Sequence, residues 1–226
     1  MSATPIHTTV RFVVMAKAPR PGLAKTRLIP ALGADGAAAL ARRLLQHALG
    51  EALAAADALG GEVVLCGTPL DAAQPTPASG SLWGLPELDA WLPHLHLQDQ
   101  GDGALGERMA RAVRDPLMAG QPCILLGTDC PTLNRDVLQQ VAHALQDHDA
   151  ALVPATDGGY VALGLRRWVA TPFEHMPWST PQVGALTVQR LTHAGLSLHT
   201  CAAHHDIDEP ADLQHLPATL QTHAQP

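Results

Sequence analysis

Aromatic side chains are scarce in this chain of 226 residues, where they make up 3% of the total. The core must therefore be aliphatic, and 46% of the residues are hydrophobic. An aliphatic core built from Leu, Val and Ala suits helices packed on a parallel sheet. The length permits one large domain or, less readily, two small ones. We expect a single domain over residues 1–226, with an ordered core at about 8–217.

Long apolar runs and secretory signals are also lacking. No stretch approaches the roughly 18 uninterrupted apolar residues of a membrane span. The first residues, Met1–His7, do not combine a charged segment with an apolar one, as a secretory signal would. The sequence therefore predicts a cytoplasmic protein without a membrane span.

The four cysteines lack any paired spacing, since Cys66, Cys123, Cys130 and Cys201 are far apart. This pattern disfavours both disulfides and structural zinc. Cys201 lies near His204 and His205, but this cluster supplies three ligands at most, and a structural zinc site needs four.

An excess of positive charge is absent as well, because the formal net charge is −7. Nucleic acids bind to wide basic surfaces that displace counterions from many phosphates, so the composition argues against them. Four cations nevertheless gather in one short loop, at Lys17, Arg20, Lys25 and Arg27. A local anion site in an acidic protein points to a small phosphorylated ligand, although a solvated basic turn before a helix has the same composition.

The basic loop follows an apolar segment at residues 10–15 that is typical of a buried strand. Ligands of open α/β sheets bind at the carboxyl ends of the strands, which is where this loop would lie. Gly22 would let the main chain approach a ligand closely. The loop is not a Walker-type phosphate loop, because that motif requires glycines where this chain has Pro19 and Ala24.

Strand and helix patterns alternate along the chain, as in a parallel or mixed sheet covered on both faces. We therefore predict an α/β fold. The expected strands are 10–15, 62–66, 95–97, 121–127, 150–154 and 160–164, and the expected helices are 34–59, about 105 onward, 136–146 and 209–216, with a long loop at 67–84 and a helix–strand pair within 181–200.

Two acidic turns are candidates for a metal site. Asp129 follows the apolar strand at residues 121–127 directly, where its carboxylate could hold a hard divalent cation or simply cap the next helix. Asp206 and Asp208 lie one residue apart, so that they point to the same side if the segment is extended. This second turn could complete the metal site, or it could be a solvated turn that opens a helix at Pro210.

Five motifs in order carry a resemblance that covers nearly the whole chain: Lys17–Leu28 (KAPRPGLAKTRL), Gly127–Pro131 (GTDCP), Asp157–Gly164 (DGGYVALG), Met176–Thr180 (MPWST) and Asp206–Leu213 (DIDEPADL). Together they resemble the bacterial DUF2064 family of GT-A-type glycosyltransferase-like proteins, also called radical-SAM/selenodomain-associated transferases, in the nucleotide-diphospho-sugar transferase superfamily. The chain is similar more distantly to guanylyltransferases of the same fold. The resemblance implies a Rossmann-like three-layer α/β/α domain with a mostly parallel mixed sheet.

The resemblance also implies a set of site residues. Lys17, Arg20, Gly22, Lys25 and Arg27 would bind the nucleotide. The substrate or acceptor would meet Asp157, Gly158, Gly159, Tyr160, Arg108 and Trp178.

The same resemblance implies Mg²⁺ or Mn²⁺ as cofactor, held by Asp129 and Asp208, with Asp206 as the competitor of Asp208. Asp129 and Lys25 would act in catalysis by stabilising the charge on phosphate oxygens, and Asp157 as an orienting group or general base. The family usually has Asp-x-Asp-Thr-Pro where this chain has Glu209 in place of the hydroxyl residue.

Plainer interpretations of the substrate residues stay open at this point. Asp157–Gly159 is also an ordinary hairpin turn, Arg108 could be a surface residue, and a lone Trp such as Trp178 more often packs than recognises a ligand. The expected partners are a nucleotide sugar or a nucleoside triphosphate and a small-molecule acceptor, with no nucleic acid.

The first functional hypothesis is metal-dependent glycosyl transfer from a nucleotide-diphospho-sugar. The alternative is nucleotidyl transfer to a phosphorylated small molecule with release of pyrophosphate. A nucleotide-binding protein that has lost catalysis is a third possibility. The sequence leaves open the donor, the acceptor, the stereochemical outcome and the oligomeric state.

Overall fold

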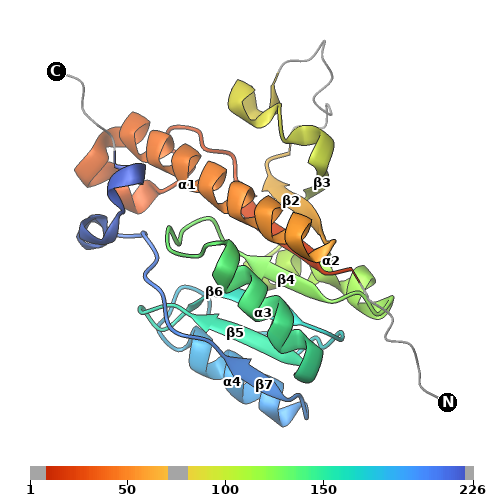
Figure 1. Ribbon diagram of the computed structural model, residues 1–226. Helices are drawn as coiled ribbons and strands as arrows, with labels where there is room; N and C mark the ends of the chain where they lie inside the picture. The colour runs from red at the N-terminus through yellow and green to blue at the C-terminus, as the bar shows by residue number, and fades with distance from the viewer. Residues whose placement is uncertain (1–8, 71–80, 222–226) are drawn as a thin grey trace.

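The computed structural model describes residues 9–70 and 81–221. Within these residues one sheet of seven strands has the order β3-β2-β1-β4-β6-β5-β7 (Figure 1). The strands are β1 Arg11–Lys17, β2 Glu62–Thr68, β3 Leu95–Asp99, β4 Cys123–Leu126, β5 Ala150–Pro154, β6 Tyr160–Leu165 and β7 Leu198–Thr200.

The sheet is mixed and mostly parallel. Strands β3, β2, β1 and β4 pair in parallel, and so do β5 and β7, whereas β6 runs antiparallel to both of its neighbours. The reversal has a local cause. Only residues 155–159 connect β5 to β6, and a parallel crossover needs a dozen residues or more. The predicted α/β fold with a mostly parallel mixed sheet is confirmed.

Helices cover both faces of the sheet (Figure 1). Helices α1 Ile29–Leu59 and α3 Arg135–Asp147 pack on one face, and α2 Leu105–Met118 and α4 Val183–His193 on the other. Strand β1 shows how the sequence supports two cores. Phe12 and Val14 point into the core with α1 and α3, while Val13 points into the core with α2, and all three are fully buried.

Helix α1 is longer than predicted, because it begins at Ile29 rather than at residue 34. Pro30 and Gly33 look like helix breakers in the sequence, yet proline is accepted in the first turn. Gly33, with φ 70° and ψ 169°, is not helical, so a short turn before it and the helix after it meet at a kink, and the helix after Gly33 begins where the sequence predicts.

Short 3₁₀ turns replace two other predicted features. The predicted loop 67–84 begins inside β2, which continues to Thr68, and it ends in a 3₁₀ turn at Leu82–Gly84. Residues 71–80 of that loop lie outside the described residues. The predicted closing helix 209–216 is a 3₁₀ helix at Pro210–His215.

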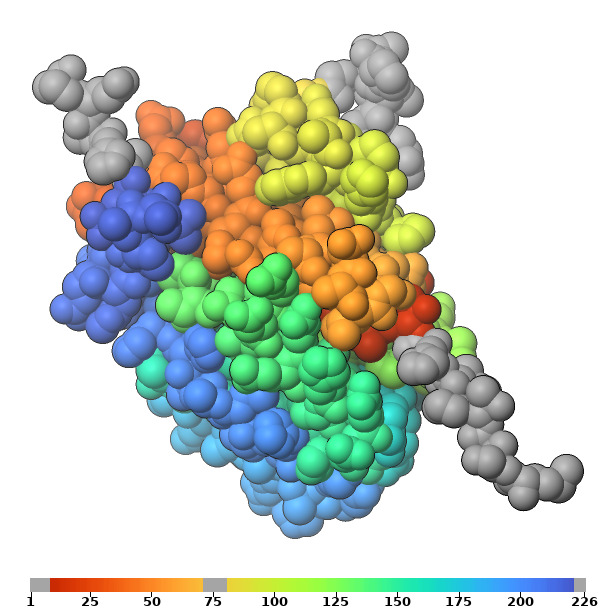
Figure 2. Space-filling model, viewed as in Figure 1, coloured from red at the N-terminus to blue at the C-terminus, as the bar shows by residue number. Residues whose placement is uncertain are grey.

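The C-terminal segment packs against the first half of α1, as the space-filling view shows (Figure 2). Ile207 is fully buried in a small cluster with Leu28, Leu40 and Leu44, and Leu216 joins the same cluster. The Arg43 side chain also donates a hydrogen bond to the carbonyl of Leu220, at 2.9 Å. These contacts hold the residues just before the 3₁₀ helix close to the end of the basic loop.

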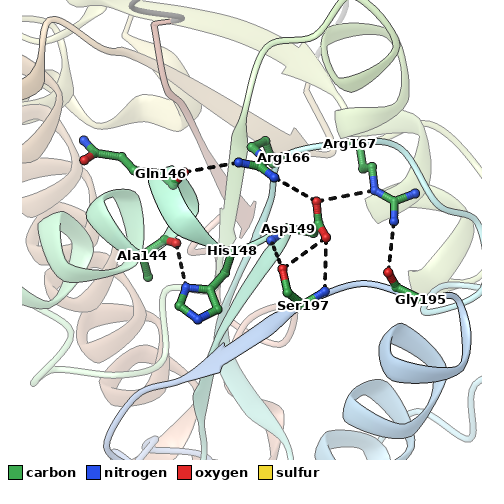
Figure 3. A network of polar contacts seen from close by, with 8 residues as sticks. All are labelled: Ala144, Gln146, His148, Asp149, Arg166, Arg167, Gly195 and Ser197. Carbon is green, nitrogen blue, oxygen red and sulfur yellow. Dashed lines mark hydrogen bonds and ion pairs between the residues drawn. The ribbon is translucent and has the colours of Figure 1, made fainter. Parts of the chain in front are cut away.

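A polar network joins β5, β6 and β7 at the edge of the sheet where β5 begins (Figure 3). The carboxylate of Asp149 accepts hydrogen bonds from the backbone and the hydroxyl of Ser197 and pairs with Arg166 and Arg167. The hydrogen bonds from Ser197 and the two arginines lower the pKa of Asp149 to about 2. This network therefore stabilises the fold. It does not lie at the edge of the sheet formed by the carboxyl ends of β1 and β4, where a ligand is expected.

No helix in the described part of the chain is both long and apolar enough to cross a membrane.

We expect Asp149→Asn to lower the free energy of unfolding at neutral pH by about 1–2 kcal/mol, because charge-assisted hydrogen bonds are lost. The folded pKa lies below the ordinary value of 3.8. The stabilisation is therefore complete above about pH 4 and is lost as the pH falls towards about 2. Urea titrations of both proteins from pH 7 downward measure this, with the exposed Asp115→Asn on α2 as control. A difference independent of pH would contradict the assignment.

Candidate functional site

A cavity of about 500 Å³ lies at the carboxyl ends of β1 and β4. Its walls come from the ends of these two strands, from the basic loop, from the first turns of α2 and α4, and from the beginning of β6. The cavity is lined by nine of the residues singled out in the sequence: Lys17, Lys25, Arg27, Asp129, Asp157, Gly159, Tyr160, Trp178 and Asp208. The structure thus brings the basic loop and the Asp129 turn to one place.

Four other candidates do not line the cavity: Arg20, Gly22, Gly158 and Arg108. The carbonyl of Arg20 accepts hydrogen bonds from Leu23 and Ala24, which close the turn of the basic loop. Gly22 lies in that turn with φ 78°, a conformation that favours glycine. The Arg108 residue is half-buried, and its side chain donates to the carbonyl of Gly103 at 2.8 Å.

Lys25 is the centre of the site. Its ammonium lies 2.6 Å from Asp129 Oδ1 and 3.6 Å from Asp208 Oδ1, and it also donates to the carbonyl of Ile207. The Lys25 side chain is only 5% exposed, whereas the two carboxylates are 46% and 40% exposed. Arg27 pairs with the other oxygen of Asp208 at 2.6 Å.

Local hydrogen bonds hold Asp208 in this position. The backbone N–H of Ile207 donates to the carbonyl of Asp129 at 2.8 Å, so the two acidic turns lie side by side. The Asp212 carboxylate accepts from the backbone N–H groups of Asp208 and Glu209, at 2.9 and 2.6 Å. Glu209 is the N-cap residue of the 3₁₀ helix, and the Asp212 side chain accepts from its backbone N–H.

Asp206 differs from Asp208 in its surroundings. Burial, together with the negative charges of Asp157, Asp129 and Asp208, raises the pKa of Asp206 to about 6. Asp206 does not line the cavity, and Asp208 is the residue that shares the Lys25 ammonium with Asp129. Four carboxylates therefore lie close together in this corner, those of Asp129, Asp157, Asp206 and Asp208.

The turn between β5 and β6 presents Asp157 to the cavity. Asp157 Oδ1 accepts a hydrogen bond from the backbone N–H of Gly159 at 2.8 Å, which fixes the orientation of the carboxylate. Gly158 adopts φ 94°, and a Cβ there would lie 2.2 Å from the carbonyl oxygen of Pro181. The N–H of Gly184 donates to the carbonyl of Gly158 at 2.8 Å. Gly158 thus allows close packing against the start of α4. The turn is a hairpin turn and also forms part of the cavity wall.

Tyr160 and Trp178 form an apolar wall. Their rings meet edge to face with centroids 6.5 Å apart. The Tyr160 hydroxyl is buried and has no hydrogen-bond partner among the described residues, and burial raises the pKa of this phenol. A buried hydroxyl without a partner is costly, so this part of the wall carries an unsatisfied polar group.

One structurally important residue was not singled out for its role. Gln100 is buried and lines the cavity, and its side-chain amide donates to the carbonyls of Ala16 and Cys66 at 3.0 and 2.9 Å. These contacts join the ends of β1 and β2 beneath the site. The sequence carries no signal for this, because a glutamine before a Gly-rich turn looks like an ordinary loop residue.

The described residues contain no group of three or more His, Cys, Asp or Glu side chains that could hold a metal ion. His204 and His205 form hydrogen bonds of 2.8 Å with Thr132 and Thr156. The donors at the cavity are the carboxylates of Asp129 and Asp208, which both approach the position of the Lys25 ammonium. Mg²⁺ is commonly bound by one or two carboxylates together with substrate phosphates, so this pair suits a hard cation that also contacts a nucleotide.

Solved structures share the fold over almost the whole chain. A candidate nucleotide-diphospho-sugar transferase from Desulfovibrio desulfuricans G20 is 30% identical, with a TM-score of 0.78 over 95% of this chain and 89% of that one. A 4-diphosphocytidyl-2C-methyl-D-erythritol synthase from Anaerococcus prevotii DSM 20548 is 10% identical, with a TM-score of 0.57 over 98% of this chain and 100% of that one.

A CMP:2-keto-3-deoxy-manno-octonic acid synthetase solved with CTP is 16% identical, with a TM-score of 0.52 over 92% of this chain and 96% of that one. At such low identity, the last two likenesses establish the fold alone. No curated protein matches the chain.

Sequence and fold together place the chain among nucleotide-using transferases, because the 30% identical neighbour that covers 95% of it is a candidate nucleotide-diphospho-sugar transferase. The family is also shown. The chain belongs to the family described as "Uncharacterized protein conserved in bacteria (DUF2064)", whose model matches residues 52–180, more than half of the 226 residues.

We expect Gly158→Ala to lower the free energy of unfolding by about 2–4 kcal/mol, because the new Cβ meets backbone atoms of Pro181 at a positive φ. Gly195→Ala is the matched control, since Gly195 has φ 72° and open space around the missing Cβ. The control substitution should cost about 1 kcal/mol, the intrinsic penalty of the left-handed conformation. Chemical denaturation measures both, and equal losses would contradict the packing role of Gly158.

Proposed function

We propose that this protein is a metal-dependent glycosyltransferase that moves a sugar from a nucleotide-diphospho-sugar to a small acceptor. The supporting observation is the 2.6 Å contact between Lys25 and Asp129 in the wall of a cavity that Lys17 and Arg27 also line. A nucleotide diphosphate needs both features, because its phosphates require cations and its metal ion requires a carboxylate.

The basic loop would bind the diphosphate. Lys17, Lys25 and Arg27 line the cavity and would stabilise the negative charge that grows on the phosphate oxygens as the donor bond breaks. Asp129 and Asp208 would hold Mg²⁺ or Mn²⁺. When bound, this ion would supply further stabilisation of the departing diphosphate.

Asp157 would orient the acceptor and receive its proton. The acceptor oxygen would bond to the anomeric carbon, the bond from that carbon to the diphosphate oxygen would break with its electron pair on the diphosphate, and the hydroxyl proton would pass to the Asp157 carboxylate. One oxygen of Asp157 is held by Gly159, so the carboxylate has a fixed direction. Tyr160 and Trp178 would form the wall against the sugar or acceptor.

Two observations favour glycosyl transfer over nucleotidyl transfer. The neighbour with 30% identity and a TM-score of 0.78 is a candidate nucleotide-diphospho-sugar transferase. Nucleotidyltransferases of this fold are expected to have a glycine-rich first loop, whereas the loop at 17–27 contains Gly22 alone. We further propose that the chain acts as one domain in the cytoplasm, a reducing compartment that suits scattered, unpaired cysteines.

We expect a nucleoside diphosphate, and not pyrophosphate, to accumulate when the protein meets nucleotide sugars, nucleoside triphosphates and acceptors with Mg²⁺ or Mn²⁺. Asp129→Asn should lower the rate about 100-fold or more, because stabilisation of the leaving group is lost. Coupled assays for the two products measure this. Pyrophosphate release dependent on Asp129 would replace the proposal by nucleotidyl transfer, and no turnover with any donor would favour a binding protein.

We expect Asp157→Asn to lower kcat about 100-fold with little change in nucleotide affinity, because proton acceptance is lost while the phosphate contacts remain. Steady-state kinetics and calorimetry measure the two quantities separately. Asp115→Asn serves as the control, since this exposed carboxylate lies towards the far end of α2. Unchanged turnover in Asp157→Asn would remove Asp157 from the reaction.

A further inference from the structure

The Lys25 ammonium occupies the position that a divalent cation would need. It lies 2.6 Å from Asp129 Oδ1 and 3.6 Å from Asp208 Oδ1, and it donates to the carbonyl of Ile207. Carboxylate and carbonyl oxygens are also the ligands that Mg²⁺ and Mn²⁺ prefer. A divalent ion and an ammonium cannot share this space, because their charges repel strongly at such distances.

The two carboxylates depend on Lys25 to different degrees. Among the described residues, Lys25 is the one cation within ion-pair distance of Asp129. Asp208 has a second cation, since Arg27 contacts its other oxygen at 2.6 Å. Asp129 therefore loses its counterion whenever Lys25 moves, whereas Asp208 keeps one.

Lys25 also has a reason to move. It lines the cavity together with Lys17 and Arg27, so phosphates bound there would attract the ammonium away from the carboxylates. Its backbone has φ 51° and ψ 41°, a left-handed conformation that is unfavourable for a residue with a Cβ. The surrounding contacts thus hold Lys25 in place against a local cost, and a change of partner can release it.

We propose that Lys25 is a resident counter-cation of Asp129 that must transfer to the phosphates of a nucleotide before a divalent ion can bind, so that metal and nucleotide bind cooperatively. This inference rests on the proposed function, because it uses the same phosphate and metal positions. The inference adds an order of events, in which the Lys25 ammonium moves to the phosphates before the divalent ion binds. The free protein binds metal weakly, and a polyphosphate raises the metal affinity by exchanging partners with Lys25. Reciprocity requires the metal to raise the polyphosphate affinity by the same factor.

The first experiment needs no variant. Equilibrium dialysis of the full chain against Mn²⁺, with free Mn²⁺ equal on both sides, gives the metal affinity with and without inorganic pyrophosphate. We expect pyrophosphate to tighten Mn²⁺ binding by about tenfold or more, within the usual range of coupling between sites. Equal Mn²⁺ affinity in the two conditions overturns the proposal.

The second experiment removes the resident cation. Lys25→Met should bind Mn²⁺ alone about tenfold more tightly than the unmodified chain, because Asp129 is left without its counterion, and pyrophosphate should no longer add much. Lys17→Met is the matched control, since it removes the same charge from the same cavity without touching Asp129. The control should change Mn²⁺ affinity by less than about threefold. In Lys25→Met combined with Asp129→Asn, the gain should vanish, and persistence of the gain overturns the assignment to Asp129.

These measurements separate the inference from the proposed function, because they use neither a sugar donor nor an acceptor. Thermal unfolding followed by circular dichroism checks that each variant is folded, and the first experiment decides alone if Lys25→Met does not fold. Cooperative binding of Mn²⁺ and pyrophosphate without any turnover would retain the role of Lys25 and reject the glycosyltransferase. Turnover without that cooperativity would reject the proposal that Lys25 must move before a metal ion binds. It would retain a transferase in which the Lys25 ammonium acts in place of the metal ion.

Discussion

The ion pair between Lys25 and Asp129 joins the two halves of the site, and the rest of the cavity is arranged around it. Lys25 comes from the loop after β1, and Asp129 comes from the turn after β4, its neighbour in the sheet. A largely buried ammonium is stable only beside anionic or carbonyl oxygens. The loop after β1 is therefore held over the carboxyl edge of the sheet, where ligands of open α/β sheets bind.

Several parts of the scaffold serve this pair. The apolar strands β1 and β4, buried on both faces, fix the positions at which the two loops leave the sheet. The C-terminal segment, packed on α1 through Ile207, brings Asp208 to the same point. The turn at Asp157–Gly159, packed against the start of α4, closes the side where an acceptor would enter. Segments distant in sequence thus meet at one cavity, which is the usual way in which this kind of sheet builds a site.

The sequence predicts the parts of this arrangement that follow from short patterns. Apolar runs place the strands, since Phe12–Val14 must be buried on both faces, and cation spacing identifies the loop at 17–27. The short helical turn before Gly33 was not predicted, because Pro30 is a breaker in most contexts but is accepted in a first turn, whereas the helix after Gly33 follows the predicted pattern. The packing role of Gly158 has no signal in the sequence, because its missing side chain makes room for Pro181, a contact that depends on tertiary packing. The pairing of Lys25 with Asp208, and the choice of Asp208 over Asp206 at the cavity, likewise depend on how the C-terminal segment packs.

The central claim is that phosphates bind between the loop at 17–27 and Asp129. A crystal structure of the protein with Mn²⁺ and a nucleoside diphosphate selected by thermal shift tests it most directly. The account predicts Mn²⁺ on the Asp129 carboxylate, the diphosphate beside Lys17 and Arg27, and the Lys25 ammonium on a phosphate oxygen instead of on Asp129. A nucleotide bound elsewhere on the protein, or one bound with the Lys25–Asp129 contact unchanged and no metal at Asp129, would contradict it.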